Sequence, residues 1–103
     1  MKLGKVRPED DVRRTKSSGN VFIDLGFDAA EAHVLEMRVE LMVYLEQFLE
    51  HSGWTQAEAA KRMGITQPRV SKLKRGKWEE FSLDMLLTLA ARIGLRAELR
   101  MAA

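Results

Sequence analysis

The sequence predicts an all-α fold in which short helices pack against one long first helix, followed by a short C-terminal β-strand. Three observations predict this fold. Apolar residues recur at spacings of three and four across residues 29–52, as they do on the buried face of a helix. Beyond them, threonine and serine residues that can cap helix starts alternate with glycines that can end helices. Over residues 95–101, apolar and charged side chains alternate strictly, which is typical of a half-buried strand.

The length of the chain, 103 residues, is that of one domain. We expect residues 1–20 to form a flexible N-terminal arm, because they are polar, lack apolar periodicity and close on Ser, Gly and Asn. The domain then covers residues 21–103. Its first stretch, VFIDLGF at 21–27, is an apolar patch that we expect to pack as an irregular segment or a single turn.

The long helix is predicted to begin after Asp28, which can cap it together with Glu31, and to end at Gly53. Its buried face is predicted to consist of apolar residues at helical spacing. These are Leu35, Val39, Leu41, Met42, Leu45, Phe48 and Leu49.

Two short helices follow, and the turn between them contains Gly64. A threonine that can cap a helix stands before each of them. Two short helices joined in this way form a helix-turn-helix unit. We expect Ile65 to fill the corner of the unit, and Val70 and Leu73 to form the inner stripe that fastens the second helix to the domain.

The last predicted helix begins after Ser82 and ends at Gly94, and the strand-like residues 95–101 come next. A strand needs a neighbouring strand to satisfy its backbone, either from an early segment of its own chain or from a second copy of the protein. We favour the second copy, because only the arm and residues 21–27 are free to supply a partner within the chain.

Charge is segregated along the chain. Residues 54–78 hold seven basic side chains and one acidic side chain, whereas residues 21–53 hold one basic and seven acidic side chains. Such segregation allows one face of a protein to attract a polyanion while another face repels it.

The face of the second short helix that lies opposite Val70 and Leu73 is rich in hydrogen-bond donors and has no carboxylate. The major groove of B-DNA admits an α-helix, and base edges there can pair with Arg, Lys or Gln or contact an apolar ring. We therefore expect this helix to read DNA bases. The predicted base-reading residues are Gln67, Pro68, Arg69 and Lys72.

Phosphate contacts are expected at both ends of the unit. A helix N-terminus favours a phosphate, and cations placed where the chain leaves the groove can hold the DNA backbone. The predicted phosphate-binding residues are Thr55, Gln56, Ser71, Lys74, Arg75 and Lys77.

The stretch TQAEAAKRMGITQPRVSKLKRGK, followed by FSLDMLLTLAARIG, resembles the phage-repressor-type (XRE) helix-turn-helix family. The resemblance implies a lambda-repressor-like helical bundle that binds operator DNA as a homodimer, with its third helix in the major groove. It gives the phosphate contact to Gln56 and base contacts to Gln67, Pro68, Arg69 and Lys72. The expected function is that of a sequence-specific regulator that binds double-stranded DNA and acts as a dimeric repressor of transcription.

Two other functions stay open. The flank SGNVFIDLGF and the strand-like tail are similar to short HigA-type antitoxins of HigBA-like pairs, which repress their own operon and neutralise a RelE-like toxin that cleaves messenger RNA. The acidic residues Glu36, Glu40, Glu46 and Glu50 would suit such a basic toxin, or they form only the solvated face of an amphipathic helix. Alternatively, the chain is a protein-interaction module that does not bind DNA.

The sequence argues against an enzyme, a metal site and a membrane protein. It has no cysteine, and His33 and His51 are too far apart along one helix to share a metal ion. The serines lack the context of a catalytic nucleophile, and the glycines are not gathered into a phosphate-binding loop, so we expect no cofactor. No apolar stretch has the length of a membrane span or the form of a secretory signal, which predicts a cytoplasmic protein.

Overall fold

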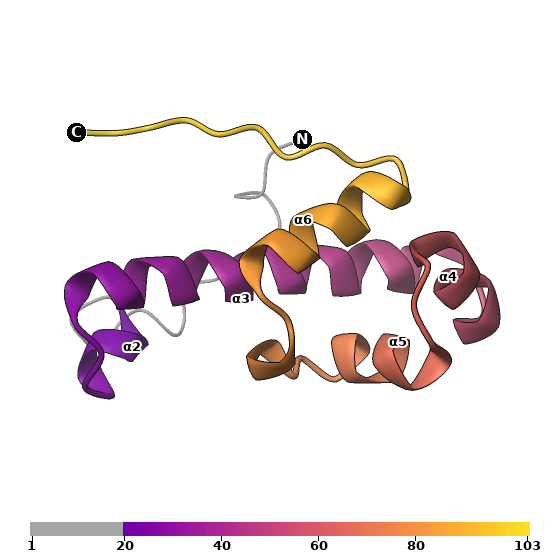
Figure 1. Cartoon of the computed structure of the whole chain (residues 1–103), viewed down its shortest axis with the longest axis horizontal. Helices are drawn as coiled ribbons and strands as arrows, with labels where there is room; N and C mark the ends of the chain where they lie inside the picture. The colour runs from indigo at the N-terminus through magenta and orange to yellow at the C-terminus, as the bar shows by residue number, and fades with distance from the viewer. Residues whose placement is uncertain (1–19) are drawn as a thin grey trace.

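The computed structural model describes residues 20–103, and in this part of the chain it confirms the all-α prediction, with one long helix at the centre. The elements in chain order are α2 (Val21–Asp24), α3 (Ala29–Ser52), α4 (Gln56–Met63), α5 (Gln67–Lys74), the 3-10 helix η2 (Trp78–Glu80) and α6 (Leu83–Arg92). Helix α3 runs along the molecule, α6 crosses it, α4 and α5 lie toward its C-terminal end, and α2 lies at its N-terminal end (Figure 1). The expected arm falls outside the described residues, except for Asn20.

Helix α3 has the ends that its sequence predicts. The Asp28 carboxylate accepts a hydrogen bond of 2.8 Å from the Glu31 N–H, and the Glu31 carboxylate accepts one of 3.4 Å from the Asp28 N–H. The helix ends at Gly53, which has a φ of 81°.

Although α3 is the longest helix, neither it nor any other helix in residues 20–103 combines the length and apolar character needed to cross a membrane.

The short helices also begin at the predicted residues. Thr55 caps α4 by accepting a hydrogen bond from Glu58 N–H, and Ser82 caps α6 in the same way through Met85 N–H. Each of these hydrogen bonds satisfies a backbone donor that has no partner inside its helix. The helix starts in this part of the chain are therefore determined locally.

The main hydrophobic core lies between α3, α4, α5 and α6. Its completely buried side chains come from all four helices: Leu45, Met63, Val70, Leu73, Leu86 and Leu89. Because every helix contributes at least one such residue, the packing holds the helix-turn-helix unit against the long helix. This arrangement explains how a short helix such as α5 is stable, since isolated helices of this length are marginal in water.

A smaller core joins α2 to α3. Phe22 is buried with Ala32 and Leu35, and its ring meets that of Trp78 edge to face at 5.4 Å between centroids. Residues 21–27 thus form the single turn that was one of the two expected arrangements. Other large apolar side chains of this region are partly exposed to solvent: Val21, Ile23, Leu25, Phe27 and Val34.

The predicted β-strand over residues 95–101 is wrong for the chain by itself. After the Leu95 N–H, which donates to the Ala90 carbonyl at 2.9 Å, this segment has no regular secondary structure. It runs as an extended tail, and no second strand from residues 20–94 lies beside it (Figure 1). The physical reason within the described residues is that residues 21–24, one of the two segments that could have paired with it, form the helix α2.

Candidate nucleic-acid interface

The scaffold of the candidate interface is the predicted helix-turn-helix. Gly64 takes a φ of 72° in the turn, a conformation that favours glycine over residues with a side chain. Ile65 packs against the core, and Val70 and Leu73 on α5 are completely buried. The inner stripe that fastens α5 to the domain is therefore confirmed.

The N-terminal ends of α4 and α5 are exposed. Thr55 and Gln56 lie at the start of α4, and Gln67 and Pro68 lie at the start of α5. Pro68 falls in the first turn of α5, where a helix needs no N–H from it. All four side chains are accessible from solvent.

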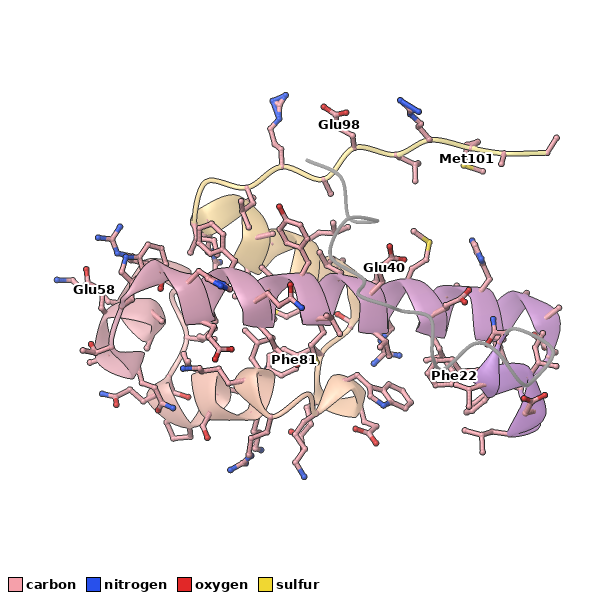
Figure 2. All side chains as sticks on the ribbon, turned by 180° about the vertical axis from the view of Figure 1, so that it is seen from behind. Phe22, Glu40, Glu58, Phe81, Glu98 and Met101 are labelled. Carbon is pink, nitrogen blue, oxygen red and sulfur yellow. The ribbon has the colours of Figure 1, made fainter. Side chains whose placement is uncertain are left out.

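The cations of α5 are arranged in two different ways. Lys74 and Arg75, at the C-terminal end of the helix, are exposed, as is Lys77 beyond it. Arg69 and Lys72, in the middle of the helix, are only partly exposed, as is the neighbouring Ser71. Several side chains that end in nitrogen project from the edge of the molecule that carries α5 and the segment after it (Figure 2).

Arg69 and Lys72 both contact the segment that follows α5. The guanidinium carbon of Arg69 lies 4.4 Å from the centre of the Phe81 ring. The Lys72 ammonium donates a hydrogen bond of 3.0 Å to a carboxylate oxygen of Glu80. Sequence reasoning missed both contacts, which give two predicted base-reading residues partners within their own chain.

The Glu80 carboxylate is surrounded by positive charge. Its pKa is lowered, first by the hydrogen bond from Lys72, and further by the charges of Lys72, Arg69 and Lys77. Glu80 is therefore ionised at neutral pH, and it places one negative charge among the residues that we expect to meet DNA.

Arg38 holds the segment after α5 to the long helix. Its guanidinium donates to the Trp78 carbonyl at 2.9 Å and to the Phe81 carbonyl at 2.8 and 3.0 Å. It also lies 5.4 Å from the centre of the Trp78 ring. Sequence reasoning missed this residue, although it had a signal: Arg38 is the one basic residue in the acidic stretch 21–53.

Arg92 makes a second long-range contact of the same kind. Its guanidinium donates a hydrogen bond of 2.8 Å to the Met63 carbonyl, at the C-terminal end of α4. The last carbonyl groups of a helix have no N–H partner within the helix, and a cation beside them is favourable. Arg92 thereby ties α6 to the turn of the helix-turn-helix.

Comparison with known proteins agrees with this geometry. A family model described as a helix-turn-helix domain matches residues 21–102. A solved structure assigned by its description to the XRE family of transcriptional regulators has 32% sequence identity and a TM-score of 0.66, and the match covers 71% of this chain and 82% of that chain. Among curated proteins, none matches the sequence. The chain belongs to the XRE-type helix-turn-helix family.

Proposed function

We propose that this protein is a sequence-specific transcriptional regulator that binds double-stranded DNA and acts as a dimeric repressor. The observation that carries the proposal is the division of α5 into two faces. Val70 and Leu73 are completely buried, while Gln67 and Pro68 project into solvent at the start of the helix. A helix held from behind in this way can enter the major groove without disturbing the core.

The proposed contacts follow from the exposed groups. Gln67, Pro68, Arg69 and Lys72 would meet base edges, since they lie on or beside the outer face of α5. The phosphate contacts would come from the N-terminus of α4 and from the end of α5. These phosphate-binding residues are Thr55, Gln56, Ser71, Lys74, Arg75 and Lys77.

Selection of bound duplexes from a random-sequence library tests the proposal. We expect enrichment of an inverted repeat whose half-sites lie about 34 Å apart, one turn of B-DNA. Affinity for the selected duplex, measured by fluorescence anisotropy, should fall steeply as salt rises. Gln67→Ala should reduce the preference for one base at one position of the site by roughly 1–3 kcal/mol. Lys74→Ala should weaken binding to all sequences alike. If the chain binds no duplex at low salt, the proposal is wrong and a protein-interaction module is favoured.

The proposal of a homodimer is supported by apolar side chains that stand in solvent at the end of the described chain. Leu99 is 76% exposed and Met101 is 85% exposed, which is unfavourable unless another surface covers them. Sedimentation of the full chain and of a chain that ends before Leu95 tests this role. An unchanged mass after truncation would remove the tail from the dimer contact.

A second candidate function is that of an antitoxin for a basic, RelE-like toxin. The observation that favours it is the placement of Glu36, Glu40 and Glu50, which fall within an arc of about 80° on an ideal helix. The Glu46 carboxylate, in contrast, lies beside Gly76, just after α5. Glu40 points away from α5 (Figure 2), so a basic partner could contact this part of α3 while α5 binds DNA. Co-purification tests the idea: a small basic ribonuclease-like protein that is retained by the chain, and released by Glu36→Gln with Glu40→Gln, would support it.

A further inference from the structure

Glu80 lies beside two of the proposed base-reading residues, Lys72 and Arg69, although it belongs to η2 and not to α5. One of its carboxylate oxygens accepts the hydrogen bond from Lys72 at 3.0 Å. The next residue, Phe81, carries the ring on which Arg69 stacks. The two cations in the middle of α5 are therefore both placed by the short segment 80–81.

This segment is held independently of the two cations. Arg38, which comes from α3, binds the carbonyl groups of Trp78 and Phe81, on either side of Glu80. Phe81 is 1% exposed and anchors the segment in the main core. The position of the Glu80 backbone is thus determined by α3 and the core, which keeps the carboxylate within reach of Lys72.

A carboxylate bonded to the ammonium changes what Lys72 can do. A free lysine ammonium on a flexible stem can reach any nearby phosphate, and such contacts carry no sequence information. An ammonium has three N–H donors, so one can remain on Glu80 while the other two are available to acceptors on a base edge. The negative charge beside it also opposes the approach of a phosphate.

We infer that Glu80 is a positioning residue for sequence recognition: it holds Lys72 over the outer face of α5 and disfavours contacts of Lys72 with phosphates. This inference rests on the proposed DNA-binding function. Its consequence is that Glu80 raises the ratio of affinity for the preferred sequence to affinity for random DNA.

The test compares Glu80→Gln with Glu79→Gln. Glu79 is the adjacent carboxylate, exposed and without a hydrogen bond or ion pair in the described residues, and its replacement changes the net charge equally. Two fluorescent duplexes are used, the sequence selected by the wild-type chain and a random sequence of equal length. We expect the Glu80→Gln variant to bind the random duplex about fivefold more tightly, because it lacks the repulsion between a carboxylate and a phosphate roughly 4 Å apart in a mostly aqueous setting. The affinity ratio should fall by at least the same factor.

Two further measurements separate the effect of the carboxylate's position from effects of its charge and of protein stability. Glu80→Asp keeps the charge but shortens the side chain, so it should lower the affinity ratio while binding random DNA no more tightly than the wild type. Urea unfolding should give both Glu80 variants nearly wild-type stability, because an exposed ion pair contributes little to folding.

An affinity ratio that is the same in Glu80→Gln, Glu79→Gln and the wild type would overturn the inference, even if the variants bind more tightly. That result differs from failure of the proposed function, in which the wild-type chain itself selects no sequence.

Discussion

Replacing Arg38 by methionine tests whether the long helix holds the segment that positions the recognition surface. Arg38 donates hydrogen bonds of 2.8 to 3.0 Å to two carbonyl groups, those of Trp78 and Phe81, and its guanidinium packs against the Trp78 ring. Methionine keeps an aliphatic stem of similar reach but removes every donor and the charge. The variant therefore isolates the polar contribution of this side chain.

The expected loss follows from the contacts. A hydrogen bond that involves a charged group contributes roughly 1.5–3 kcal/mol, and a partly exposed cation–π contact adds about 0.5–1 kcal/mol. Because Arg38 is only partly buried, water can replace some of these bonds in the variant. We expect the free energy of unfolding to fall by about 2–4 kcal/mol, a large share of the roughly 5–15 kcal/mol that is typical of a domain.

Urea unfolding followed by far-UV circular dichroism measures this loss, and Arg62→Met is the matched control. Arg62 also stacks on a tryptophan, at 4.4 Å from the Trp54 ring centre, but its polar partner is the exposed carboxylate of Glu58. Its replacement should cost no more than about 1 kcal/mol. If both variants lose the same amount, the hydrogen bonds of Arg38 do not hold the segment and the reasoning is refuted.

Three other predictions concern the pH dependence of stability, the backbone conformation at Gly64 and the affinity for DNA. Burial, and then the charge of Glu50, raises the pKa of Glu46, so its contribution to stability is greatest below pH 4.5 and is lost as pH rises through the raised pKa. The Glu46→Gln variant should lack this loss of stability. Its urea midpoint should therefore exceed that of the wild type at pH 7 but not at pH 4. Gly64→Ala should destabilise by about 1–2 kcal/mol in urea unfolding, because φ is 72° and a Cβ would lie 3.1 Å from the Arg92 guanidinium. Lys77→Ala should weaken anisotropy-measured binding of all duplexes alike and reduce the salt slope by about 1.

The parts of the fold that could be predicted from sequence are those that depend on neighbours along the chain. The Asp28 and Thr55 caps act on N–H groups three residues away, so their effect is visible in a short window of sequence. Helical periodicity likewise identified Val70 and Leu73 as the buried stripe of α5, because any partner must cover the same face of the helix. These local signals were sufficient for the long helix and for the helix-turn-helix.

The strand prediction shows where a local pattern is insufficient. Alternation over residues 95–101 indicates which side chains would share a face, but a strand exists only when a second backbone lies beside it. Helix formation by residues 21–24 removed a candidate partner within the chain, and that event depended on the burial of Phe22 against α3 and Trp78.

The sequence by itself determined the long helix, the three capped helices after it and the sign of the charge on α5, while the tertiary structure alone decided what those charges contact. Arg38 reaches carbonyl groups 40 and 43 residues away, and Lys72 meets Glu80 from a different element. The physical reason is that a side chain's environment depends on every segment folded against it. A helix, in contrast, is closed by hydrogen bonds between residues four apart, so its limits can be read along the chain.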